Sequence, residues 1–289
     1  MSNLAVRIAT AAILLPGIIF LLFLENSAFF CLLAGIVSLL ATHEVFAMLR
    51  RLGYRPFSSL GYGVVALIQF AAYAAFKEWP HAYSWNVHLS VAVVTALVAG
   101  ILLAQFARGH NTVNLGNACV TVLGVLYAGW LSSFIIRLRG VPNGAQWVFV
   151  ALSLTWIFDS AAYFWGSSVG RTKLWVEVSP GKTWEGFIGG ILTTVVVVWA
   201  AFVLLPEAFL FRVAPYRAST GFMLALAVAL SVIAQAGDLV ESMIKRTVGI
   251  KDSSALIPGH GGILDKIDSM LFTVPLVYYA ALIAQGMLV

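Results

Sequence analysis

Charged residues are scarce in this chain of 289 residues. Asp, Glu, Lys and Arg together make up 10% of it, whereas a soluble domain carries about 25%. Hydrophobic residues make up 61%, and the mean hydropathy is +0.95. No soluble core requires so large an apolar share. The composition therefore excludes a soluble globular protein and predicts an all-α, polytopic integral membrane bundle, a single membrane domain over residues 1–289.

Cysteine is also scarce, since Cys31 and Cys119 are the only two, and both lie in apolar runs without disulfide or metal spacing. A secretory signal peptide is not expected, because Arg7 precedes an apolar run too long for a signal-peptide core. The net charge of +5 could indicate nucleic acid. In a membrane protein, however, basic residues first report topology and contact with anionic lipid headgroups. We expect membrane lipids as partners and no nucleic acid.

Apolar stretches of about 20 residues predict transmembrane helices. The expected spans are roughly 5–24, 28–48, 60–76, 88–107, 118–136, 146–165, 187–205, 221–240 and 270–288.

Lys and Arg residues predict how these spans are oriented. If the N-terminus and every second loop share one side, that side holds 12 of the 17 Lys and Arg residues and the other side holds 5. The positive-inside rule then places the N-terminus in the cytoplasm. Two motif-bearing loops, 166–186 and 238–268, face the same side. We expect 1–117 to be a scaffold and 118–289 to be the catalytic half.

Three familiar catalytic patterns occur in this chain only in part or outside the structural context that they require. Residues 181–183 resemble the end of a phosphate-binding P-loop, but Val176 stands where that motif requires glycine. Residues 166–170 match the nucleophile-elbow string, but they follow a membrane span and no strand. His43-Glu44 begins like a zinc-protease helix, but Ala47 replaces the second histidine.

The loop 166–186 has a simpler candidate chemistry. Its Ser-Pro-Gly-Lys-Thr segment, 179–183, resembles a turn that enters a helix, where free N–H groups attract anions. Phosphate binding is one interpretation; the other is that Ser179 caps the seventh span while nearby bases face lipid phosphates. The candidate nucleotide-binding residues here are Ser179, Lys182 and Thr183.

The segment from Asp238 to Asp268 concentrates charge between apolar spans, with 9 charged residues out of 31. Charge held there indicates a functional site by default, although a cytoplasmic loop would also be charged. Acids one helical turn apart share a face, and carboxylates from two helix ends would hold Mg²⁺, with a second cation also considered. For Glu241, an i,i+4 ion pair with Lys245 is the expected alternative. The candidate metal ligands are Asp238, Asp265 and Asp268.

Basic residues and glycines lie between these acids. The bases would neutralise a polyphosphate, and the glycines permit backbone angles that expose N–H groups as an anion nest. Outside this segment, the lone Asp159 in an apolar span would line a polar cavity, pair with a base or fix helix packing. The remaining candidates of the segment are Lys245, Arg246, Lys251, Asp252 and His260 as catalytic residues and Gly259, Gly261 and Gly262 as phosphate-binding residues.

The motifs resemble a known family at this point. Ser242-Met-Ile-Lys245-Arg246, Lys251-Asp252-Ser253-Ser254 and the run from Pro258 to Asp268 resemble the signature of phosphatidate cytidylyltransferase, also called CDP-diacylglycerol synthase. Residues 179–186 and 159–163 resemble its other shared blocks. The family usually has Arg where this chain has Lys266, so a bidentate grip would be lost.

The resemblance implies that CTP and phosphatidic acid react, with Mg²⁺, to give CDP-diacylglycerol and pyrophosphate at the cytoplasmic face of a bacterial inner membrane. It also implies a homodimer. Three alternatives remain: a CTP-dependent polyprenol or lipid kinase, an ion-coupled membrane transporter, and a structural membrane protein that binds headgroups. A transporter would be expected to have paired broken helices in two related halves, whereas the motifs of this chain lie mostly in its second half.

Overall fold

The computed structural model describes residues 3–77, 92–101, 103–104, 112–204, 219–259 and 261–286. Both ends of the predicted span 88–107, the last residue of 187–205 and the predicted site residue His260 lie outside the described residues.

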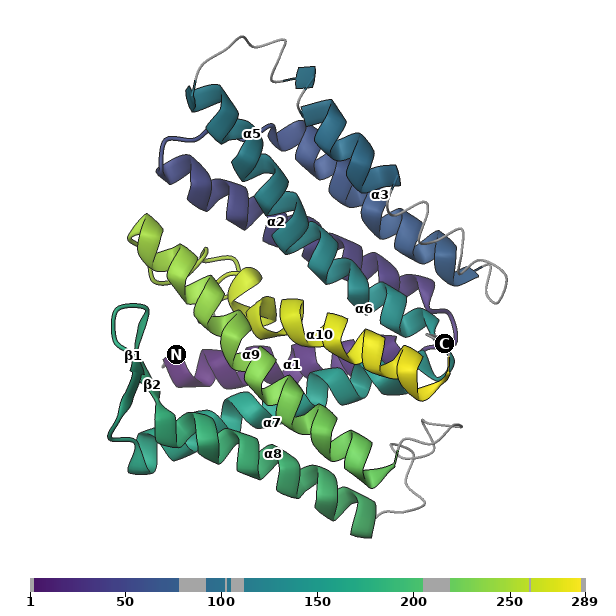
Figure 1. Cartoon of the computed structure of the whole chain (residues 1–289), viewed down its shortest axis with the longest axis vertical. Coiled ribbons are helices and arrows are strands. Elements are labelled where there is room, and N and C mark those ends of the chain that lie inside the picture. The colour runs from purple at the N-terminus through teal and green to yellow at the C-terminus, as the bar shows by residue number, and fades with distance from the viewer. Residues whose placement is uncertain are drawn as a thin grey trace. The chain divides into compact units, whose positions relative to one another are not determined.

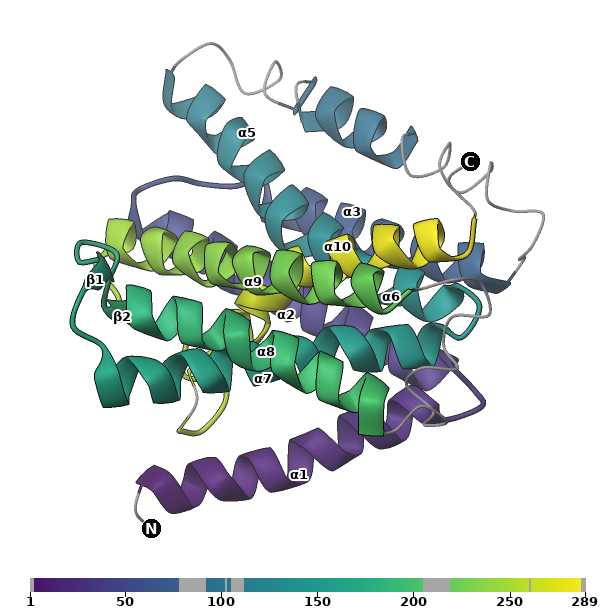
Figure 2. The ribbon, with the colours of Figure 1, turned by 60° about the horizontal axis from the view of Figure 1, so that its bottom comes forward.

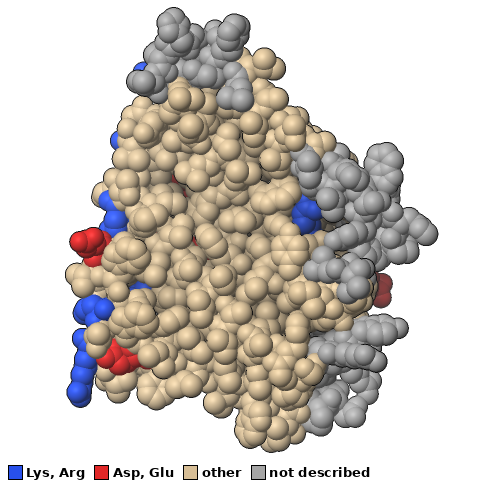
Figure 3. All heavy atoms as spheres, in the orientation of Figure 1, with Lys and Arg blue, Asp and Glu red and all other residues tan. Residues whose placement is uncertain are grey.

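Long apolar helices dominate the described chain and confirm the all-α class. Seven of them are long and apolar enough to cross a membrane, and each coincides with a predicted span: Ala28–Arg51, Ser58–Ala75, Leu115–Gly140, Gly144–Val169, Trp184–Leu204, Thr220–Val248 and Leu264–Ala284. The first predicted span coincides with helix α1, Asn3–Phe23. In the view of Figure 3 the described surface is largely uncharged, as expected where lipid covers a protein.

The chain divides into two compact units. Unit 1 comprises 1–140 and 247–267, and unit 2 comprises 141–246 and 268–289. The division that the sequence suggested at residue 117 stays a prediction. The described helices of unit 1 include α1, α2 (Ala28–Arg51), α3 (Ser58–Lys77), the short helix Ala92–Ile101, α5 (Thr112–Gly124), the π-helix η1 (Val125–Trp130) and α6 (Leu131–Gly140).

Glycines set the packing of unit 1. A Cβ added at Gly61 of α3 or Gly124 of α5 would lie within 2.7 Å of the ring of Phe46 in α2. The absence of side chains at both positions leaves room for that ring, which is fully buried. At Gly129 of η1 the neighbour is Val65, 2.4 Å from an added Cβ. Large side chains on one helix therefore fill spaces that glycines leave on the next, as at other close helix contacts in membranes.

Unit 2 holds α7 (Gly144–Val169), α8 (Trp184–Leu204), α9 (Thr220–Val248, to Arg246) and α10 (Leu264–Ala284, from Asp268). Helices α7 and α8 lie side by side in Figures 1 and 2, with the hairpin of β1 (Lys173–Trp175) and β2 (Ser179–Thr183) at one end of the pair. Small residues make this contact: a Cβ at Gly186 would lie 2.7 Å from the carbonyl oxygen of Ala162, and one at Gly190 would lie 2.8 Å from Phe158.

The hairpin corrects one expectation. The segment 179–183 forms strand β2 rather than a turn that enters a helix, because it pairs antiparallel with β1, Lys173 opposite Thr183 and Trp175 opposite Ser179. Helix α8 begins only at Trp184. Its cap is Thr183, whose Oγ1 accepts a hydrogen bond from Gly186 N at 3.1 Å. Ser179 therefore does not cap the seventh span.

Candidate active site

Three carboxylates and one ammonium group gather within unit 2. They come from separate elements: Asp159 from α7, Asp238 from α9, Asp268 from α10 and Lys182 from β2. Lys182 Nζ lies 2.6 Å from Asp238 Oδ2. Asp159 and Asp268 each interact electrostatically with both Asp238 and Lys182. We call these four residues the acid cluster; it holds three acids against one base.

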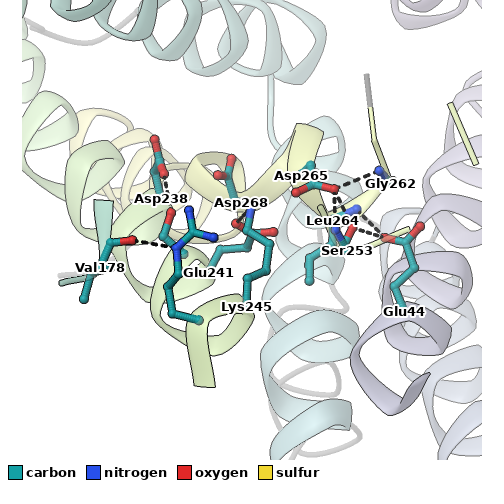
Figure 4. Close-up of polar contacts among 12 residues, drawn as sticks. Glu44, Val178, Asp238, Glu241, Lys245, Ser253, Gly262, Leu264, Asp265 and Asp268 are labelled. Atoms are coloured by element: carbon teal, nitrogen blue, oxygen red, sulfur yellow. Dashed lines mark hydrogen bonds and ion pairs between the residues drawn. The ribbon is translucent and has the colours of Figure 1, made fainter. Parts of the chain in front are cut away.

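A glycine brings two of these acids together. A Cβ added at Gly237 of α9 would lie 2.9 Å from the carbonyl oxygen of Asp268 and 3.2 Å from Ser269 Cα. Only glycine allows α10 to approach so closely, and the next residue of α9 is Asp238. The hydroxyl of Ser242 donates to Asp238 Oδ1 at 3.3 Å, and Ser269 N donates to Asp268 Oδ1 at 2.6 Å. Figure 4 shows Asp238 and Asp268 on their helices.

The acid cluster is partly exposed. The side chain of Asp238 is 33% exposed and that of Lys182 is 19% exposed. The Nζ atom of Lys182 is itself buried, so Asp238 is the more accessible partner of the ion pair.

The basic residues of α9 interact with other residues of the chain. Lys245 forms an ion pair with Glu241 one turn earlier, and the carboxylate of Glu241 is fully buried. This confirms the i,i+4 pair expected from the sequence. Arg246 Nε donates to the carbonyl oxygen of Val178 at 3.2 Å and so ties the hairpin turn to α9. Their phosphate-binding roles stay predictions.

The hairpin is also tied to the start of α8. The carboxylate of Glu185 accepts hydrogen bonds from the backbone N–H groups of Arg171 and Thr172 at 3.1 Å. Together with the Thr183 cap, this fixes the strand that carries Lys182. The acid cluster therefore has its one base on a short, braced strand.

A second polar cluster lies within unit 1. Asp265 Oδ2 accepts three hydrogen bonds, from Ser253 N at 2.8 Å, Ser253 Oγ at 2.7 Å and Gly262 N at 2.8 Å. The carboxylate of Glu44, from α2, binds the same segment through Ser253, Ser254 and the N–H groups of Ile263 and Leu264. Figure 4 shows the contacts of these two carboxylates with Ser253, Gly262 and Leu264. We call the segment 253–265 the signature loop.

The predicted glycine nest is thus partly filled by the chain's own anions. Gly259 and Gly261 have positive φ values of 75° and 85°, as a nest requires, but Gly262 N donates to Asp265. Lys251 and Asp252, just before the loop, are exposed. The roles assigned to these residues stay predictions.

Comparison with known proteins identifies the family of this chain. The model of the cytidylyltransferase family matches residues 5–284. The chain belongs to the cytidylyltransferase family. A phosphatidate cytidylyltransferase of Staphylococcus aureus is 33% identical over 94% of this chain and 96% of its own length, and that of Staphylococcus haemolyticus gives the same values. That of Bacillus subtilis is 39% identical over 64% of this chain and 66% of its own length.

The carboxylate oxygens of the acid cluster are the kind of group that binds a hard divalent cation such as Mg²⁺. In the described chain no three His, Cys, Asp or Glu side chains come close enough to hold one ion by themselves. Mg²⁺ does not require such a cage, since it typically takes one or two carboxylates and completes its shell with water and substrate phosphates. Asp238 and Asp268 would supply the two carboxylates; the role of Asp265 as a ligand stays a prediction.

Sequence reasoning missed one buried acid of unit 1 and left the role of another acid, in unit 2, open. In the sequence Glu44 belongs to an incomplete zinc-protease motif, but as a lone acid in the apolar run 28–48 it is also a functional signal, just as Asp159 is in its span. Asp159 received three open interpretations, and the structure places it with Asp238 and Lys182. No local pattern connects either residue with its partners.

Proposed function

We propose that this protein transfers CMP from CTP to phosphatidic acid and releases pyrophosphate. The family membership and the similarity to curated phosphatidate cytidylyltransferases over almost the whole chain support the reaction class and the lipid acceptor. The observation that carries the chemical assignment is the pairing of Lys182 with Asp238 in a cluster of three acids. Such a cluster provides ligands for a cation and one base for a phosphate.

In the proposed reaction a phosphate oxygen of phosphatidic acid attacks the α-phosphorus of CTP in line with the departing pyrophosphate. A new P–O bond forms, and the bond from the α-phosphorus to the bridging oxygen breaks, with its electron pair leaving on pyrophosphate. A phosphate monoester has a second pKa of about 6, so the nucleophile is already ionised near neutral pH. The protein needs no strong general base; it must align two anions and neutralise their charge.

The residues of the acid cluster divide this work. Asp238 and Asp268 would hold Mg²⁺, which supplies charge neutralisation on the phosphate oxygens. Lys182 would leave Asp238 and donate its hydrogen bonds to a phosphate oxygen of the substrate. Because Lys182 lies on the braced strand β2, its ammonium group stays within side-chain reach of the acids during this exchange. Ser179 and Thr183, which lie on the same strand as Lys182, are further proposed contacts of CTP.

The remaining predicted residues belong to the same proposal. Four basic side chains would contact the polyphosphate: Lys245 and Arg246 of α9, Lys251, and His260 of the signature loop. The excess of Lys and Arg on one side of the predicted topology supports a cytoplasmic active site, where CTP is available. A homodimer in the cytoplasmic membrane is proposed from the family resemblance.

The decisive assay uses the purified full-length protein in detergent with CTP labelled on the α-phosphate and phosphatidic acid. We expect label in the lipid and release of pyrophosphate, both only with Mg²⁺ present. A lipid kinase would instead transfer the γ-phosphate and leave CDP. Transfer of γ-label, or no CTP-dependent product with any lipid acceptor, would contradict the proposal.

A further inference from the structure

The carboxylate of Glu44 is buried in the interior of α2, with 3% of the residue exposed. It accepts four hydrogen bonds from a segment more than 200 residues further along the chain. Oε1 accepts from Ser254 Oγ at 2.6 Å and from Ile263 N at 3.0 Å. Oε2 accepts from Ser253 Oγ at 3.0 Å and from Leu264 N at 2.8 Å. One side chain therefore holds both ends of the signature loop (Figure 4).

The sequence of the loop is adapted to this carboxylate. A Cβ added at Gly262 would lie 2.6 Å from both Oε1 and Oε2 of Glu44 and 2.1 Å from Ser253 Oγ. A contact under 3.0 Å is one that real Cβ atoms essentially never show. A side chain at position 262 would therefore push the ends of Glu44 and Ser253 out of their hydrogen-bonded positions. The φ value of Gly262 does not call for a glycine, since in this loop Gly259 and Gly261 have positive φ and Gly262 does not.

Ser253 connects Glu44 with Asp265. Its hydroxyl oxygen lies 3.0 Å from Glu44 Oε2 and 2.7 Å from Asp265 Oδ2. The hydroxyl carries a single hydrogen, so it can donate to only one of the two carboxylates at a time. Any movement of Glu44 therefore changes the hydrogen bonding of Asp265, one of the predicted cation ligands.

We propose that Glu44 is a positioning residue for cytidylyl transfer. It fixes the signature loop in the form in which that loop contacts the triphosphate of CTP. This inference rests on the proposed function, because the loop's contact with CTP is part of that proposal. A buried carboxylate within a membrane span is energetically expensive, so one retained there marks a functional role by default.

The charge of Glu44 is essential to this geometry, and an amide cannot replace it. Each carboxylate oxygen accepts from one hydroxyl and one backbone N–H. A hydroxyl can rotate and accept instead, but a backbone N–H can only donate. Whichever way the amide of Glu44→Gln turns, its NH₂ group faces an N–H, and either Ile263 N or Leu264 N loses its acceptor. The substitution preserves the side-chain volume and removes one of the four hydrogen bonds that attach the loop to α2.

The test compares steady-state kinetics of Glu44→Gln with wild type, in detergent and with saturating Mg²⁺. We expect the KM for CTP to rise roughly 10- to 100-fold, as when one hydrogen bond to a charged group is lost, while the KM for phosphatidic acid stays near the wild-type value. Amide hydrogen exchange should increase within 253–265 and remain unchanged in α7 and α8. The exchange measurement requires no turnover.

A matched control separates positioning from stability. Gln69 is also buried in unit 1, with 6% of the residue exposed, and it donates to Ser38 Oγ, Gly129 O and Ser132 Oγ, none of which belongs to the signature loop. Gln69→Leu should lower the melting temperature and the number of active molecules but leave the KM for CTP unchanged. If Glu44→Gln behaves in the same way, the inference is wrong.

Two further outcomes remain informative. If Glu44→Gln does not fold, Ser254→Ala removes one hydrogen bond to Oε1 and should raise the KM for CTP in the same direction, by a smaller factor; an unchanged KM would overturn the inference. If the wild-type protein itself transfers no CMP, the proposed function fails, whereas an active wild type with a normal Glu44→Gln defeats only the role of Glu44.

Discussion

Replacing Gly186 by Ala tests whether close packing of α7 and α8 positions the acid cluster. The added Cβ would lie 2.7 Å from the carbonyl oxygen of Ala162, about 0.7 Å short of the 3.4 Å at which ordinary contact begins. The neighbour is backbone, so the clash cannot be relieved by rotating a side chain. Helix α8 must move away from α7 by several tenths of an ångström, and the strand that carries Lys182 moves with it.

The expected magnitude follows from two opposing effects. Overpacking a close contact costs about 1–3 kcal/mol, whereas Gly→Ala in a helix interior gains up to about 1 kcal/mol. The cost of the clash therefore equals or exceeds the gain in helix propensity, and the net loss of stability is about 0–3 kcal/mol. Activity should fall more than stability does, because a misplacement of about 1 Å at a reacting centre can cost roughly 10²-fold. We expect a 10- to 100-fold loss of CMP transfer.

Gly63→Ala is the matched control. Gly63 lies within α3, and nothing lies within 4 Å of its added Cβ. Both variants gain the same helix propensity, so the difference between them isolates the clash. The assay is release of pyrophosphate from CTP together with the melting temperature in detergent. If Gly186→Ala equals Gly63→Ala in both measurements, the packing of α7 on α8 does not position the site.

The other predictions concern single charges. Lys182→Met should reduce CMP transfer roughly 10²- to 10³-fold while tightening Mg²⁺ binding in calorimetry, since Asp238 loses its internal partner; normal turnover would exclude Lys182 from the reaction. Asp238→Asn and Asp268→Asn should each raise the Mg²⁺ concentration needed for half-maximal activity, whereas Glu177→Gln, an exposed acid of the hairpin turn, should not. Lys266→Arg should leave KM and kcat within about 2-fold, because the Lys266 side chain is exposed, and such surface substitutions usually change energies by about 0.5 kcal/mol or less.

Local patterns in the sequence were sufficient for the features that depend on neighbouring residues. The run length of apolar residues identified seven helices that the structure describes as long enough to span a membrane. The spacing of Glu241 and Lys245 predicted their ion pair. These features require only the periodicity of a helix, which connects residues three or four positions apart.

Features that depend on distant residues were not predictable in this way. Glu44 and Ser253 are 209 positions apart, and no periodicity links them. The Ser-Pro pair in the segment 179–183 predicts a helix start, because proline is frequent at the first position of a helix. The segment is a strand instead, because it pairs with β1. The partner strand, Lys173–Trp175, has only three residues, too few to show alternation in the sequence.

The two polar clusters suggest opposite uses of negative charge. In the signature loop, the carboxylates of Glu44 and Asp265 accept hydrogen bonds from backbone N–H groups and hydroxyls, so their charge stabilises a fixed loop. In the acid cluster, three carboxylates face a single ammonium group, so negative charge is in excess. An excess of this kind is unfavourable near a membrane unless a cation joins it. Loss of Mg²⁺ should therefore disturb the acid cluster and leave the signature loop intact, and hydrogen exchange after treatment with a chelator can distinguish the two.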